Sequence, residues 1–129
     1  MKNNELRIGN YVQHKGEIIK VEQITKRKIG YHKYADKRTM QYLKYSEIEP
    51  IEITEDILLK IGLEKVKVYS RENFIGDNND VLLSHFYDKD YWRAIIYFNQ
   101  CTIGKNIKYI HELQNAFFIA NNKELKLKF

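Results

Sequence analysis

Residues 26–45 read KRKIGYHKYADKRTMQYLKY, and this stretch decides how the first part of the chain folds. Residues 28–34 and residues 40–45 each place side chains alternately on two faces, as expected for two β-strands with one buried face. The polar residues 35–39 separate them. The pattern therefore predicts a β-hairpin with a charged loop.

More short strands are predicted before this hairpin. Residues 6–12 are strand-like and are interrupted by Gly9-Asn10, a turn signal, and Gly16 marks the next turn. Residues 17–24 partly alternate and predict another strand. Short strands at this spacing favour a small SH3-like antiparallel barrel over residues 1–53.

The remaining residues, 54–129, predict a second subdomain with a sheet and helices. Thr54 is a suitable N-cap for a short helix that ends at Gly62. Strands are expected at 64–69, 81–87, 91–98 and 125–129, with a polar loop over 70–80. We expect an α+β protein in which the two parts pack together or form one domain.

The best helix is expected at residues 110–121. Leu113, Ala116, Phe117 and Ala120 repeat at the spacing of one apolar helix face, and Asn121-Asn122 are suitable stop residues.

The composition is that of an ordinary soluble chain of one domain or two small subdomains. It has 129 residues, of which 43% are hydrophobic and 30% charged. No apolar run has the length of a signal peptide or a membrane span, so we expect a cytoplasmic protein. Cys101 is the single cysteine, and its strand-like surroundings predict a buried, inert thiol.

Positive charge is concentrated in residues 26–45. They hold seven Lys or Arg and one acid, a formal charge of +6, whereas the whole chain carries +5. Cations interleaved with aromatic rings suit a partner that offers phosphates and bases, RNA more than duplex DNA, or a host nucleoprotein. The candidate binding residues are Lys26, Arg27, Lys28, Tyr31, His32, Lys33, Tyr34, Lys37, Arg38, Tyr42, Lys44 and Tyr45.

Two structural alternatives explain the same residues without a partner. In the first, the tyrosines pack inward and the lysines only solvate the surface. In the second, the acidic residues within 46–56 pair with the hairpin and cancel its field. Strand alternation places Tyr42 and Lys44 opposite Leu43 and Tyr45, so some tyrosines should stay exposed beside cations. Exposed Tyr next to Arg is also typical of protein–protein hot spots.

No motif predicts a catalytic residue, a metal site or a cofactor. His111-Glu112 lacks the second histidine of a zinc-protease helix, because Asn115 stands there. The four histidines are far apart, and Asp77-Asn78-Asn79-Asp80 lacks the spacing of a calcium loop. A pocket that holds His85 or His111 with a carboxylate would favour an enzyme.

Three stretches carry a resemblance. They are LRIGNYV at 6–12, IEPIEITEDILLKIG at 48–62 and HELQN at 111–115 followed by Phe117-Phe118. Together they resemble an uncharacterised family of small proteins of phages, prophages and mobile elements. The resemblance implies a mobile-element protein that binds and inhibits a host nucleic-acid-guided defence effector, of the anti-CRISPR type, at the effector or its guide RNA. A general RNA- or single-stranded-DNA-binding module is the alternative.

Overall fold

The computed structural model describes residues 1, 5–33, 39–68, 71–76, 80–85, 90–98 and 101–129. The chain divides into two compact units, Met1–Ile51 and Glu52–Phe129. Both are built from antiparallel strands, and one main helix lies near the C-terminal end, so the chain is an α+β protein.

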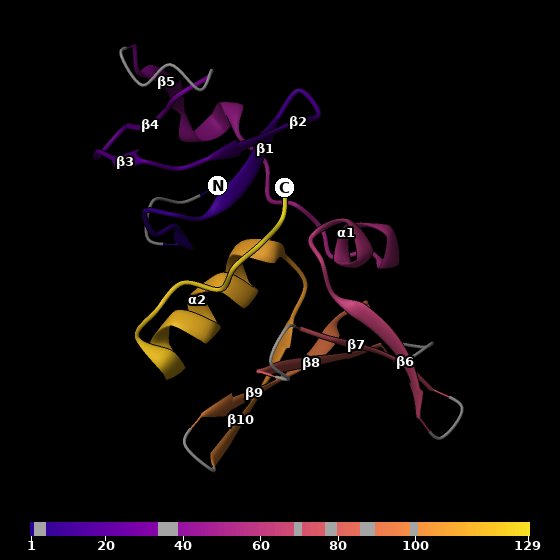
Figure 1. The fold of residues 1–129 in the computed structure, drawn as a ribbon. Coiled ribbons are helices and arrows are strands. Elements are labelled where there is room, and N and C mark those ends of the chain that lie inside the picture. Colours follow the sequence, from indigo (N-terminus) through magenta and orange to yellow (C-terminus); the bar gives the residue numbers. More distant parts are fainter. Residues whose placement is uncertain (2–4, 34–38, 69–70, 77–79, 86–89, 99–100) are drawn as a thin grey trace. The chain divides into compact units, whose positions relative to one another are not determined.

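The first unit contains two small sheets (Figure 1). Strands β1 (Tyr11–His14) and β2 (Glu17–Lys20) form a hairpin, and β3 (Gln23–Ile24), β4 (Lys28–Tyr31) and β5 (Gln41–Lys44) form a three-stranded sheet in that order. Neither sheet closes on itself within the described residues, so the SH3-like barrel is not confirmed. A short 3₁₀ helix, η2 (Tyr45–Glu47), follows β5.

The β1–β2 turn follows directly from its two residues. Lys15 and Gly16 have φ angles of 49° and 80°, and they join His14 to its partner Glu17. Positive φ at both central residues matches the right-handed twist of a two-residue hairpin, as predicted from Gly16.

Alternation of side chains builds the core of the first unit. Along β5, Leu43 is buried and its neighbours Tyr42 and Lys44 are exposed. The core residues are Leu6, Val12, Ile19, Val21, Ile29, Tyr31, Leu43 and Ile48.

The second unit is a five-stranded meander with helices on one face. Its strands are β6 (Glu64–Val68), β7 (Arg71–Ile75), β8 (Val81–His85), β9 (Trp92–Phe98) and β10 (Cys101–Ile107), each paired with the next. Helix α1 (Glu55–Lys60) contacts β6, and α2 (Ile110–Asn121) contacts β9 and β10 (Figure 1). Phe74, Leu83 and Ala94 are buried on the covered face.

Both helices begin and end where the sequence predicts. The Thr54 hydroxyl accepts a hydrogen bond from Ile57 N at 3.2 Å, and Gly62 follows α1 with φ 103°. Glu112 Oε1 accepts from Lys108 N and Tyr109 N at 3.0 Å each, which satisfies free donors at the start of α2.

Three sequence predictions were wrong in the second unit. Within the loop predicted at 70–80, residues Arg71–Ile75 form β7. Residues 125–129 do not form a strand, although Lys128 N donates to Ile61 O at 3.1 Å. Cys101 is exposed, because it starts the edge strand β10.

Candidate nucleic-acid interface

The turn between β3 and β4 presents two cations at its tip. Thr25 N donates to Lys28 O at 2.9 Å, which closes the chain around Lys26 and Arg27. Lys28 N donates in turn to the Thr25 hydroxyl at 3.0 Å instead of to the Thr25 carbonyl. The side chain of Thr25 thereby replaces a backbone acceptor, and both Lys26 and Arg27 remain exposed.

Tyr45 binds the Thr25 carbonyl, which the Lys28 amide leaves available. Its hydroxyl donates to Thr25 O at 2.5 Å, although the two residues are 20 positions apart. The Tyr45 ring is partly buried against the core of the first unit. Burial raises the pKa of the Tyr45 hydroxyl above 10.0, so it stays protonated and able to donate. Tyr45 therefore positions the turn and does not offer its hydroxyl to a partner.

Two more cations lie beside this turn. Lys28 on β4 and Lys44 on β5 are direct cross-strand partners, so their side chains extend from the same face of the sheet. Both are exposed. Like charges placed directly opposite destabilise a sheet in the absence of a counter-ion.

Tyr42 lies on that same face, one step further along β5. Gln23, Gly30 and Tyr42 form a row across β3, β4 and β5. The Tyr42 hydroxyl donates to Gln23 Oε1 at 3.1 Å, so the ring reaches across β4 at the residue that has no side chain. The side chain of Tyr42 is 51% exposed and is fixed in orientation.

Gly30 is a point of close approach inside strand β4 and not a turn or bulge residue. A Cβ at this position would lie 2.5 Å from Met40 Sδ and 3.0 Å from Gln23 Cβ. Gly30 therefore leaves room for both side chains on the face that carries Tyr42.

We define the basic face as Lys26, Arg27, Lys28, Tyr42 and Lys44. All five are exposed, as is Lys33. None of the four cations of the basic face forms an ion pair with another residue in the part of the chain that the structure describes.

The other predicted residues are placed differently. Tyr31 is 8% exposed and belongs to the core. The His32 ring is half-buried, and its Nδ1 pairs with Glu22 Oε2. Tyr34, Lys37 and Arg38 lie outside the described residues. The explanation by inward packing therefore holds for Tyr31 and Tyr45 but not for Tyr42.

In the acidic stretch after β5, the Glu47 side chain and the Glu49 backbone bind backbone groups of the first unit. Glu47 Oε1 accepts from Lys44 N at 3.0 Å, which starts η2. The backbone of Glu49 pairs with that of Gln13 in both directions, at 2.8 and 2.9 Å. Neither contact neutralises the ammonium group of Lys44.

Sequence reasoning missed Thr25, Gln23 and Met40, which shape the interface without carrying charge. The one available signal was Gly30, because a glycine inside a strand marks a bulge or a close approach of other groups. The hydroxyl of Thr25, immediately before Lys26, is a weaker sign of a turn.

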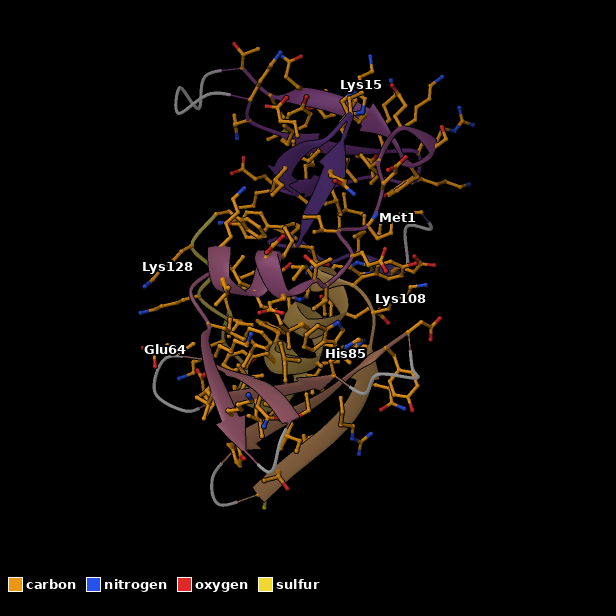
Figure 2. The ribbon with its side chains drawn as sticks, turned by 90° about the vertical axis from the view of Figure 1, so that its right-hand side faces the viewer. Met1, Lys15, Glu64, His85, Lys108 and Lys128 are labelled. Carbon is orange, nitrogen blue, oxygen red and sulfur yellow. The ribbon has the colours of Figure 1, made fainter. Side chains whose placement is uncertain are left out.

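A second candidate site lies in the second unit. A pocket of about 360 Å³ is lined by Glu52, Ile53, Thr54, Glu55, Phe74, His85, Asp90 and Trp92. It combines His85 with carboxylates, the arrangement that would favour an enzyme. Figure 2 shows His85 and Lys108 on the same side of this unit.

The contacts of these pocket residues do not form an acid–base pair. The His85 ring stacks on Trp92, with centroids 4.6 Å apart, and makes no hydrogen bond to a described carboxylate. Glu55 pairs with Lys65 at 2.6 Å, and Asp90 lies 3.8 Å from Lys108 Nζ. Trp92 Nε1 donates to Ile53 O at 3.1 Å, which fixes the indole below the pocket.

The described residues contain no group of three or more His, Cys, Asp and Glu side chains that is arranged to hold a metal ion. His111 is 4% exposed, and its ring lies parallel to that of Tyr109. Neither α1 nor α2 has the length and apolar composition to cross a lipid bilayer, and no other described helix has them.

Comparison of the chain with protein-family models, with curated proteins and with solved structures gives no match. The basic face therefore has to be interpreted from its own geometry and charge.

Proposed function

We propose that this chain is a non-enzymatic, mobile-element-type protein that binds RNA through the basic face. The observation that carries the proposal is the placement of Lys26, Arg27, Lys28 and Lys44 around one turn, exposed and without acidic partners among the described residues. A row of phosphates would supply the counter-charge that Lys28 and Lys44 do not find among the described residues.

Tyr42 favours a single-stranded partner over duplex DNA. Bases of a single strand are free to stack on an exposed aromatic ring, whereas those of a duplex are already stacked. The bond from Tyr42 to Gln23 fixes the ring beside the cations, so little side-chain freedom would be lost on binding.

We further propose that the bound RNA is the guide of a host defence effector in the cytoplasm, which the protein would inhibit in the anti-CRISPR manner. The support for this step is the resemblance to small mobile-element proteins.

We also propose an SH3-like arrangement for the first unit. Its short consecutive antiparallel strands support this proposal.

Fluorescence anisotropy with a labelled single-stranded RNA tests binding at the basic face. Four phosphate contacts predict a slope of about −3 for the logarithm of the affinity against the logarithm of salt concentration. A triple variant, Lys26→Glu, Arg27→Glu and Lys28→Glu, should abolish binding at moderate salt.

The matched control is the triple variant Lys67→Glu, Lys123→Glu and Lys126→Glu, which makes the same change of charge in the second unit. It should retain most of the affinity. Equal losses in both triple variants would show that only net charge matters, and absence of RNA binding at low salt would refute the proposal.

A general RNA- or single-stranded-DNA-binding module is the second candidate, because cations and an aromatic ring contact phosphates and base faces, which every sequence offers. A reconstituted guide-loaded effector separates the two. An inhibitor should bind the loaded effector more tightly than the free guide and should lose both binding and inhibition in the basic-face triple variant. A general module should bind free RNA and free single-stranded DNA equally well.

A further inference from the structure

The face of the five-stranded sheet opposite α1 and α2 carries a row with charges of opposite sign at its two ends. Cross-strand pairing aligns Glu64, Ile75, Leu82, Ile95 and Gly104 across β6, β7, β8, β9 and β10. Glu64 is exposed and the three apolar residues are half-buried, whereas Phe74, Leu83 and Ala94 on the covered face are at most 1% exposed. We call the side with the row the outer face.

The positive end of the row is the guanidinium group of Arg93. A Cβ at Gly104 would lie 2.9 Å from Arg93 Cζ, so the guanidinium occupies the space above Gly104. Asn106 Oδ1 accepts a hydrogen bond from Arg93 Nη1 at 3.0 Å and holds the group in place.

Both terminal charges of the row lack a counter-ion among the residues whose positions the structure gives. Neither Glu64 nor Arg93 forms an ion pair within the described part of the chain. Figure 2 shows Glu64 at the start of β6, which is one edge of the sheet. The contact with Gly104 places the Arg93 guanidinium over β10, which is the other edge.

This order of groups is self-complementary. A two-fold axis that runs parallel to β8, above Leu82, would place each sheet over the other with the strand order reversed. Leu82 would then face Leu82 of the other copy, Ile75 would face Ile95, and Glu64 would face Arg93. We propose that the outer face binds a second copy of this chain.

The charges of this row fit a second copy of the chain better than they fit a nucleic acid. The row offers one cation and one carboxylate around an apolar centre, so a polyanion would gain one contact and meet one repulsion. Such a centre with charges at the rim is the anatomy of a protein–protein interface. Aligned packing of two twisted sheets also accommodates strands that run in the same direction.

The size of the face predicts a weak dimer. Five strands span about 19 Å at ordinary strand spacing. Strands of five residues are about 17 Å long, so the face covers about 300 Å², which is below the roughly 800 Å² per partner of a standard stable interface. Interfaces of standard size already include complexes of only micromolar affinity, so this dimer should form and dissociate at higher protein concentrations, from about 100 μM upward.

Sedimentation velocity over a concentration series tests the proposal. The wild-type chain should shift from monomer to dimer. Glu64→Arg and Arg93→Glu should each weaken the dimer at least about tenfold, because each creates two like-charge contacts in a symmetric pair. An equimolar mixture of the two variants should dimerise again, because both contacts are then attractive.

Glu17→Arg and Lys20→Glu are the controls, since they make the same charge changes at exposed sites of β2. Leu82→Lys, at the centre of the row, should abolish dimerisation while circular dichroism shows an unchanged thermal transition. A chain that stays monomeric at every concentration, or a mixture that associates no better than either variant alone, would overturn the proposal. A different protein partner on this face would give the first of these results.

Discussion

Lys28 and Lys44 lie directly opposite each other on β4 and β5, and neither has an acidic partner among the residues described for this protein. The free protein therefore tolerates a repulsion that one substitution would remove. Replacing Lys44 by an acid therefore tests its role. If Lys44 serves binding, the replacement should stabilise the fold and weaken binding, whereas if Lys44 serves the fold, the replacement should destabilise it.

Lys44→Glu should stabilise the fold and weaken binding. An opposite charge facing Lys28 is expected to raise the free energy of unfolding by about 0.2–1 kcal/mol. RNA affinity should fall, since a phosphate contact becomes a repulsion. Urea denaturation and anisotropy measure the two effects. If the variant is more stable and binds RNA as well as the wild type, Lys44 is not part of the interface.

Substitutions of Tyr42 should separate its ring from its hydroxyl. Tyr42→Phe loses the bond to Gln23 but keeps the stacking surface, so most RNA affinity should remain. Tyr42→Ala should cost about 1–3 kcal/mol of binding free energy, the usual range for one stacked base. Equal affinities of the Phe and Ala variants would exclude stacking at this position.

Tyr45→Phe should loosen the basic turn and alter stability at high pH. Loss of the bond to Thr25 O should lower the free energy of unfolding by about 1 kcal/mol at neutral pH. The pKa of Tyr45 is raised in the folded state, so its contribution is complete below pH 10.0 and declines as the pH rises through the folded-state value.

The stability difference between wild type and Tyr45→Phe should therefore shrink above pH 10. Chemical denaturation of both chains across this range measures it, and the other tyrosines are common to the two proteins. A difference that is constant with pH would mean that the hydroxyl titrates alike in the folded and unfolded chains.

Gly30→Ala should destabilise the first unit by about 1 kcal/mol, because overpacking of a close contact displaces Met40 and Gln23. Met40→Ala should relieve part of this cost, since Met40 Sδ is the nearest atom to the new methyl group. A double-mutant cycle from denaturation curves gives the coupling energy. Strictly additive effects would place the strain elsewhere.

Local signals in the sequence were sufficient for the helices and several hairpins. Thr54 and Gly62 bound α1, and the apolar spacing from Leu113 to Ala120 identifies α2, as observed. The hairpin of β8 and β9 followed from two strands around a polar turn. These features depend on residues close together in the chain, so a single sequence contains them.

Features that depend on distant neighbours were not predictable. Strand β7 contains Arg71, Glu72 and Asn73 and reads as a loop, but pairing on both sides makes it a strand. Residues 125–129 alternate as a strand does, yet they do not pair as one. The burial of Cys101 failed as a prediction because β10 is an edge strand, a property of sheet order alone.

The candidate interface was predictable in its charge but not in its geometry. Composition alone points to Lys26, Arg27, Lys28 and Lys44. Only the register of β4 and β5 shows which of these cations face each other, and only packing assigns Tyr31 to the core and Tyr42 to the surface.

The guanidinium above Gly104 couples two positions of the chain. A side chain at position 104 would displace the exposed guanidinium of Arg93 from the space above the sheet. The fold would lose little, because a long and flexible side chain can move aside, but the positive charge would no longer be held over β10. Related sequences that keep the arginine at 93 as a contact should therefore favour glycine at 104, and this preference can be read from sequences without any measurement on the protein.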